Sequence, residues 1–365
     1  MTSRADDEKF MARAIEVARR HLGLTDTNPS VGCVIVKDGN IIAEASTSVS
    51  GRPHAERNAL ALAGEAALGA TAYVTLEPCS HYGKTPPCAN ALVEAGVGRV
   101  VVAVNDPDER VSGRGYQILR DAGIQVETGL LRKEAQRGLA GYLIRKTRNR
   151  PQVILKLAVS SDGKIGREGE GQIAITGPEA RQAVQTLRAE CDAILVGIGT
   201  VLADDPELTV RIPGMEDRSP IRVVLDRNLQ IPTSSKLVRT ARDVPVIVVT
   251  SNQTARADEA WHLMQGGLLA GVGVELLNAV GLASLLHSLG ERGMSNLLVE
   301  GGAAVARSFL EAGLVDRILL FEGPDAIGAG GVETPLARND MPKEFTFVGE
   351  TAFGADRCFE YERPL

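Results

Sequence analysis

Apolar residues follow two spacings along the first 150 residues. Recurrence at helical spacing predicts helices, and short runs rich in β-branched residues predict strands. The segment 37–40, Lys-Asp-Gly-Asn, is typical of a tight turn within a β-hairpin. Short strands that alternate with helices favour an α/β sheet covered on both faces. The predicted helices are Phe10–Gly23, Ala55–Leu68, Pro87–Ala95 and Gly115–Ala122, and the predicted strands are Val31–Val36, Ile41–Ala45, Thr71–Leu76, Arg99–Val104 and Gln125–Thr128.

The remaining residues repeat this alternation. The pattern favours a Rossmann-like three-layer sheet, and a chain of 365 residues has room for about two domains. Strands are expected at Val153–Val159, Ala193–Val196, Ile221–Leu225, Val246–Thr250, Val274–Leu277, Asn296–Val299 and Arg317–Phe321, and helices at Pro178–Cys191, Leu282–Arg292 and Ala303–Ala312.

Charge divides the chain in the middle. Residues 1–150 carry 20 basic and 17 acidic side chains, net +3, and residues 151–365 carry 20 and 29, net −9. The change follows the basic run Arg145–Arg150 and precedes Pro151, so we expect domains at 1–147 and 151–365. The basic run fits a solvated helix end better than a nucleic-acid patch, because it contains no aromatic residues. We expect no nucleic-acid partner.

The first residues and the cysteine content favour the cytoplasm. No uninterrupted apolar run reaches the ~18 residues of a spanning helix, and we expect no membrane partner. The first ten residues contain three acids and no apolar core of a secretory signal. Five cysteines, an odd number, argue against a disulfide framework and leave some of them available as metal ligands.

Three separated residues predict a zinc site. His54 lies where a predicted hairpin gives way to a helix, Cys79 follows a predicted strand, and Cys88 opens a predicted helix. One imidazole and two thiolates leave a fourth tetrahedral position for water, whose pKa zinc lowers to about 7. Glu56, two residues after His54, is then placed to carry protons between that water and a leaving amine.

Simpler interpretations of the same residues stay open. The two cysteines could be a buried pair, with His54 as a helix cap. His81 competes for the ligand role, because it lies between the cysteines in the sequence. The other three cysteines are expected to be packing residues; these are Cys33, Cys191 and Cys358.

The pattern His-x-Glu at 54–56 followed by Pro78-Cys79 matches the signature of zinc deaminases that act on nucleobases. Together with this pattern, three further segments resemble the bifunctional deaminase/reductase family of riboflavin biosynthesis, and the resemblance covers nearly the whole chain. It implies an α/β protein with an N-terminal cytidine-deaminase-like three-layer α/β/α domain and a C-terminal dihydrofolate-reductase-like α/β domain. The segments are Asn-Pro-Ser-Val-Gly-Cys-Val at 28–34, the long cysteine spacer Ser-His-Tyr-Gly-Lys-Thr-Pro-Pro at 80–87, and Asn-Asp-Pro at 105–107.

For the first domain, the resemblance implies zinc-dependent hydrolytic deamination of 2,5-diamino-6-(5-phosphoribosylamino)pyrimidin-4(3H)-one. His54, Cys79 and Cys88 would hold Zn²⁺, and Glu56 would be the catalytic proton carrier. Asn28 and the loop 77–84 would contact the base and its ribose phosphate. Asn28-Pro29 is also an ordinary turn before a strand.

Two segments of the second half suit polar ligands. The strand-to-helix junction 299–303 contains Gly301-Gly302, where backbone amides can approach a phosphate, although such a turn also serves packing. Residues 199–211 include Thr200, two aspartates and an arginine, which bind ligands or cap a short helix.

Together with residues 156–164, these segments resemble the reductase half of the family. The resemblance implies hydride transfer from NADPH to the ribosyl group of 5-amino-6-(5-phosphoribosylamino)uracil, which becomes ribityl. The implied NADPH contacts are Ala158, Ala174, Thr200, Asp204, Gly302, Ala303, Ala304, Val305, Ala306, Arg307 and Ser308. The implied substrate contacts are Gln172, Arg188, Leu208, Arg211 and Glu300, with the two arginines suited to the 5-phosphate.

One departure from the family pattern lies in residues 171–177, where Ala174 stands in place of a tryptophan that many relatives have. Two competing functions stay in view, and this departure supports only the second of them. The first is a nucleoside or RNA deaminase fused to a non-catalytic NADPH-binding domain, against which the acidic second half and the long cysteine spacer argue. The second is a ligand sensor that binds NADPH without turnover. We expect small phosphorylated pyrimidines as ligands, and a homo-oligomer.

Overall fold

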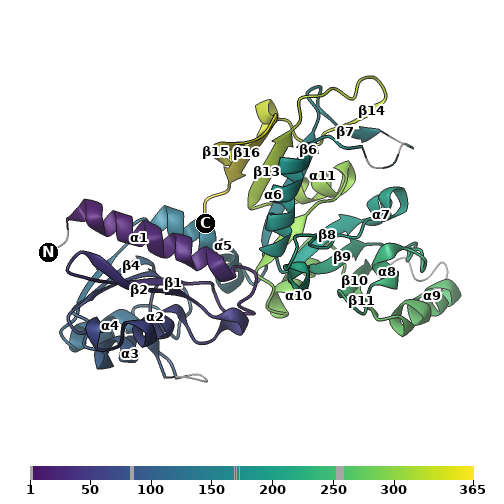
Figure 1. Cartoon of the computed structure of the whole chain (residues 1–365). Helices are drawn as coiled ribbons and strands as arrows, with labels where there is room; N and C mark the ends of the chain where they lie inside the picture. Colours follow the sequence, from purple (N-terminus) through teal and green to yellow (C-terminus); the bar gives the residue numbers. More distant parts are fainter. Residues whose placement is uncertain (1–2, 83–85, 168, 170, 172, 252–258) are drawn as a thin grey trace. The chain divides into compact units, whose positions relative to one another are not determined.

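The structure is a computed structural model that describes residues 3–82, 86–167, 169, 171, 173–251 and 259–365 (Figure 1). For residues 259–263 it describes the backbone but not the side chains. It divides into two compact units, residues 1–149 and residues 150–365. No helix among the described residues is both long and apolar enough to cross a membrane.

Unit 1 is a three-layer α/β/α structure. Its five-stranded sheet has the order β2-β1-β3-β4-β5, in which β2, β1 and β3 are antiparallel neighbours and β3, β4 and β5 are parallel. Helices α1 and α5 cover one face, and α2, α3 and α4 lie on the other (Figure 1). The strands are β1 (Gly32–Lys37), β2 (Asn40–Ser46), β3 (Thr71–Leu76), β4 (Arg99–Val104) and β5 (Gln125–Thr128), and the helices are α1 (Arg4–Ala18), α2 (Ala55–Ala63), α3 (Cys88–Glu94), α4 (Arg114–Asp121) and α5 (Arg132–Arg148).

Three helix boundaries in unit 1 differ from the sequence prediction by five residues or more. Helix α1 begins six residues before Phe10, because Ser3 and Asp6 form a capping box. It ends at Ala18, five residues before the predicted Gly23, and a short 3₁₀ helix follows at Arg19–His21. Helix α2 ends at Ala63 because Gly64 adopts a positive φ of 54° and a short 3₁₀ turn follows.

Unit 2 is built on a nine-stranded sheet of order β11-β10-β9-β8-β12-β6-β13-β16-β15. The first seven strands of that order are parallel, and β16 and β15 extend the sheet as an antiparallel hairpin. A separate two-stranded ribbon pairs β7 with β14. The strands are β6 (Gln152–Val159), β7 (Lys164–Arg167), β8 (Ala193–Gly197), β9 (Ile221–Leu225), β10 (Val246–Thr250), β11 (Val274–Asn278), β12 (Asn296–Val299), β13 (Arg317–Glu322), β14 (Gly331–Glu333), β15 (Thr346–Phe353) and β16 (Asp356–Glu362).

Helices cover both faces of this sheet. Apolar side chains of α6, α8 and α9 belong to the core on one face, and those of α10 and α11 to the core on the other. The strand order differs from the Rossmann order 3-2-1-4-5-6, because β12 returns to lie between β8 and β6. The helices are α6 (Pro178–Ala189), α7 (Ile198–Asp204), α8 (Lys236–Arg239), α9 (Glu259–Gly271), α10 (Leu282–Glu291) and α11 (Ala303–Glu311).

The position of β12 between β6 and β8 also determines where the second candidate site lies. Strands β6, β8 and β12 are parallel neighbours, so the loops that follow them leave the sheet at the same edge. This edge, at the carboxyl ends of parallel strands, is where open α/β sheets bind ligands.

Candidate functional site

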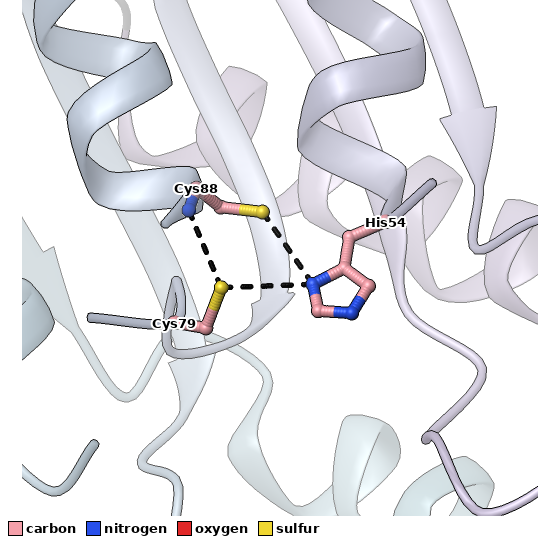
Figure 2. A group of neighbouring side chains, drawn as sticks. All are labelled: His54, Cys79 and Cys88. Carbon is pink, nitrogen blue, oxygen red and sulfur yellow. Dashed lines mark hydrogen bonds between the residues drawn. The ribbon is translucent and has the colours of Figure 1, made fainter. Parts of the chain in front are cut away.

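The first candidate site lies where two helices begin beside the end of β3. His54 is the N-cap residue of α2, and Cys88 is the first residue of α3. Cys79 follows β3 after two residues. Because α2 and α3 pack against each other, their N-termini bring His54 and Cys88 to the loop that carries Cys79 (Figure 2).

The three side chains point at one another. The Nδ1 atom of His54 lies 3.6 Å from the sulfur of Cys79 and 3.5 Å from the sulfur of Cys88 (Figure 2). All three possible ligand atoms lie within 4.8 Å of one another. A tetrahedral zinc ion bonded to sulfur at 2.3 Å and to nitrogen at 2.0–2.1 Å would separate these two atoms by about 3.6 Å. The residues therefore fit a zinc ion in both chemistry and spacing.

Electrostatics around the sulfurs favour a thiolate at Cys79. The side chain of Cys88 and, after it, that of His54 lower the pKa of the Cys79 thiol to about 4. The backbone N–H of Cys88 also donates to the Cys79 sulfur at 3.3 Å. The contact with Cys79 and burial together raise the pKa of the Cys88 thiol. A bound cation would stabilise both sulfurs as thiolates.

Glu56 lies in the first turn of α2 and is 3% exposed. Burial raises the pKa of its carboxyl to about 7. A carboxyl with such a pKa can both accept and deliver a proton near neutral pH. His81 does not join the ligand cluster within the described residues, although it lines the same cavity.

The cavity in front of these residues has a volume of about 630 Å³, which is within the range of small-ligand pockets. Asn28 lines it, and the space beside the Asn28 amide is kept by Gly51, where a Cβ atom would lie 2.3 Å from the amide nitrogen. Lys84 lies outside the described residues. The sequence pattern at 105–107 entered only through the family resemblance. Several lining residues had no predicted role in this site, among them Asp106, Asp108, Arg110, Tyr142, Arg145 and Lys146.

The second candidate site is a cavity of about 300 Å³ at the carboxyl ends of β6, β8 and β12. Gly301 and Gly302 lie between β12 and α11. A Cβ atom on Gly301 would lie 2.7 Å from Val305, whereas one on Gly302 would meet only the Thr200 hydroxyl at 3.8 Å. Gly301 is therefore needed for packing, and the backbone of Gly302 is open to a ligand. Nine of the predicted contacts line this cavity: Ala158, Ala174, Arg188, Thr200, Asp204, Leu208, Arg211, Glu300 and Gly302.

The other predicted NADPH contacts, which belong to helix α11, do not line the 300 Å³ cavity. Ala304, Val305 and Ser308 line a neighbouring cavity of about 510 Å³, beside the ends of β9 and β10. Ala306 is fully buried in the core, so its side chain cannot reach a ligand. Ala303 and Arg307 line neither cavity. Gln172 lies outside the described residues.

Three charged residues form the floor of the 300 Å³ cavity. Arg188 of α6 donates to both carboxylate oxygens of Glu300, at 2.8 and 2.9 Å. Lys156 of β6 lines the same cavity, and burial lowers the pKa of its ammonium group. Lys156 was missed by sequence reasoning, which used its segment only for the family resemblance.

Comparisons with known proteins agree with this geometry. The family model described as "RibD C-terminal domain" matches residues 151–359, and the one described as "Cytidine and deoxycytidylate deaminase zinc-binding region" matches residues 4–104. The riboflavin biosynthesis protein RibD of Escherichia coli is 42% identical over 335 residues, 88% of this chain and 89% of that protein. RibD of Aquifex aeolicus is 40% identical over 324 residues, 89% of this chain and 88% of that protein.

Solved structures show the same likeness. A structure of Acinetobacter baumannii RibD covers all of both chains at 37% identity, with a TM-score of 0.86. A Thermotoga maritima protein covers 99% of both chains at 35% identity, with a TM-score of 0.85. It is named a diaminohydroxyphosphoribosylaminopyrimidine deaminase and 5-amino-6-(5-phosphoribosylamino)uracil reductase. The fold class expected from the sequence is confirmed.

Proposed function

The chain belongs to the RibD family of riboflavin biosynthesis proteins, and on that premise we propose which of its residues perform the two reactions. It is a bifunctional enzyme with a deaminase domain and a reductase domain. The whole-length likeness to RibD does not favour the alternative of a nucleoside or RNA deaminase with a non-catalytic second domain. We assign the deaminase to residues 1–147 and the reductase to residues 151–365.

One observation carries the deaminase assignment. His54, Cys79 and Cys88 converge within 4.8 Å, and buried Glu56 lines the same cavity as His54 and Cys79. In our proposal the two sulfurs and the His54 Nδ1 atom hold zinc. When bound, zinc lowers the pKa of a water molecule to about 7, so that a nucleophilic hydroxide is available near neutral pH.

Side chains of the cavity orient the substrate and transfer the proton. The pyrimidine enters with the amino group at C2 facing Glu56. Glu56 takes a proton from the attacking water and delivers it to the amine, which leaves as ammonia. Asn28, at the wall of the cavity, orients the base through its amide, which can donate and accept hydrogen bonds.

For the reductase we propose that NADPH lies along the N-terminal part of α11. Support comes from the two cavities, of about 300 and 510 Å³, which are lined by residues of α11 and its N-terminal loop. Gly302, the N-cap residue of α11, presents its backbone toward a phosphate. Thr200 and Asp204 of α7 line the first cavity from the other side. NADPH supplies the hydride.

The substrate then occupies the remainder of the first cavity. Arg211, whose side chain is 55% exposed, is placed to pair with the 5-phosphate. Glu300, held by Arg188, faces the ribosyl group, and Leu208 packs against the substrate. Ala174 also lines this cavity, so the absent tryptophan leaves room there.

An assay in two stages tests the proposal. The diaminopyrimidine phosphate is supplied first without NADPH, and ammonia is measured. NADPH is then added, and its oxidation is followed by absorbance. We expect ammonia release in the first stage, and NADPH oxidation that begins at once in the second. Ammonia from cytidine or RNA, without ammonia from the pyrimidine phosphate, would contradict the proposal.

We also propose that the enzyme acts in the cytoplasm, as a homo-oligomer. All five cysteines are free, and the proposed zinc site needs reduced thiols. Such thiols are maintained in a reducing compartment. Cell fractionation and light scattering test the two statements. Recovery outside the cytoplasm, or a particle of monomer mass, would contradict them.

A further inference from the structure

Helix α5 ends in a basic run that the two proposed active sites leave unused. The sequence pattern favours a solvated helix end for residues 145–150. The structure instead places Arg145 and Lys146 in the lining of the cavity that contains His54 and Glu56. Their side chains therefore face the proposed deaminase substrate.

Lys146 reaches across to the loop that follows β4. Its ammonium nitrogen donates to a carboxylate oxygen of Asp108 at 2.9 Å. Arg110, from the same loop, donates to both Asp108 oxygens, at 2.9 and 2.6 Å. Asp108 is only 10% exposed at its side chain, and the contact with Arg110 holds the pKa of its carboxyl well below the usual range. Asp108 thus stays ionised and keeps Arg110 and Lys146 side by side.

A second set of contacts fixes the helix end from behind. The hydroxyl of Tyr142 donates to the two oxygens of buried Asp106, at distances of 3.0 and 3.1 Å. The Tyr142 ring lies 5.9 Å from the Arg145 guanidinium carbon and 5.8 Å from the Lys146 nitrogen. Arg145 also donates to the backbone oxygen of Thr27, next to Asn28, at 2.5 Å. The cations are therefore held in place before a ligand binds.

We propose that Arg110, Arg145 and Lys146 form an anion subsite of this cavity and bind the phosphate of the phosphorylated pyrimidine. Three cations share this wall with two carboxylates, Asp106 and Asp108, and so leave an excess of one positive charge for an anion. A lysine ammonium has three donors, and the contact with Asp108 uses one of those of Lys146. This inference rests on the proposed deaminase function of the same cavity.

The test compares Lys146→Gln with Lys133→Gln. Lys133 lies on the same helix, is exposed and does not line the cavity, so it is the matched control. Loss of one charge-assisted contact should raise the KM for the phosphorylated pyrimidine between about 10-fold and 150-fold. The kcat, and the KM for the corresponding nucleoside without phosphate, should stay within about 2-fold of wild type. Lys133→Gln should match wild type in every value.

Binding of ribose 5-phosphate, measured by calorimetry with Arg211→Ala present in every protein to remove the phosphate contact proposed for the reductase, gives a readout that does not depend on deamination. Wild type and Lys133→Gln should bind it, and Lys146→Gln and Arg145→Gln should each bind it at least 10-fold more weakly. The inference is wrong if both cavity variants retain wild-type affinity for ribose 5-phosphate. It is also wrong if both raise KM equally for the phosphorylated and unphosphorylated substrates. If wild type releases no ammonia from either substrate, the proposed function fails, and the calorimetry still decides on the subsite.

Discussion

Arg188 binds Glu300 through both carboxylate oxygens, with Nε–Oε1 at 2.8 Å and Nη2–Oε2 at 2.9 Å. The two side chains are 11% and 10% exposed. The family resemblance assigns both residues to the substrate. Because Glu300 occupies the planar fork of Arg188, we now propose that Arg188 mainly orients Glu300. Arg211, whose guanidinium Glu300 does not occupy, then remains as the predicted phosphate contact of this cavity.

The first prediction concerns Arg211→Ala. Loss of a charge-assisted contact with the 5-phosphate costs about 1.5–3 kcal/mol. The KM for 5-amino-6-(5-phosphoribosylamino)uracil should therefore rise between about 10-fold and 150-fold, while the Kd for NADPH stays near that of wild type. Steady-state kinetics and fluorescence titration with NADPH measure the two values. An unchanged KM with weakened NADPH binding would mean that the two ligands occupy each other's proposed positions.

The second prediction concerns Arg188→Met, which leaves the buried Glu300 without its partner. Removal of one member of a buried ion pair typically costs about 3–5 kcal/mol. We expect a loss near the lower end of this range, because Lys156 also attracts the Glu300 carboxylate. Urea unfolding of unit 2, followed by circular dichroism, measures the loss. Adding Glu300→Gln should recover part of the stability; no recovery would show that the two residues do not act as a pair.

Much of the sheet could be predicted from apolar runs. Strands β3, β4, β5, β9, β10 and β12 have the predicted bounds, because they are short segments between clear turn residues. The hairpin β15–β16 was missed. Residues 346–353 at the sheet edge are mostly polar or half-exposed, so their sequence lacks the apolar run that identifies a buried strand. The capping box at Ser3 and Asp6 was visible in the sequence, and its spacing could have corrected the start of α1.

Candidate site residues were predictable where a motif links them, as for His54 and Cys79. Lys146 could not be assigned in this way. Its partner Asp108 is 38 residues earlier in the chain, and only the packing of α5 against β4 brings the two together. The pairing of Arg188 with Glu300 spans 112 residues and has no local signal either.

The third prediction concerns metal content. Cys88→Ser replaces one of the three proposed ligands with a hydroxyl, which is a much weaker zinc ligand than a thiolate. Purified wild type should contain about one zinc per chain, and Cys88→Ser should contain little. Cys191→Ser is the matched control, because Cys191 is buried in the core of unit 2. Elemental analysis after gel filtration gives the comparison; equal zinc in wild type and Cys88→Ser would refute the ligand assignment.

The fourth prediction concerns acid stability of unit 1. Hydrogen bonds from Arg13 lower the pKa of Glu44 from 4.5 to about 2. A folded-state pKa below the unfolded value stabilises the fold above pH 4.5, and this contribution is lost as the pH falls toward 2. Hydrogen exchange of β2 should therefore be faster in Glu44→Gln than in wild type at pH 7. The difference should shrink between pH 4.5 and pH 2. A difference independent of pH would contradict the ion pair.

The central claim is that one chain carries two separate active sites, and Glu56→Gln tests it most directly. Glutamine is nearly isosteric with glutamate but cannot carry protons at neutral pH. The variant should keep its zinc and lose about 10²–10⁴-fold in the rate of ammonia release. In the same preparation, NADPH oxidation with the already deaminated substrate should proceed at the wild-type rate. Ammonia release at the wild-type rate, or a parallel loss of both activities, would contradict the account.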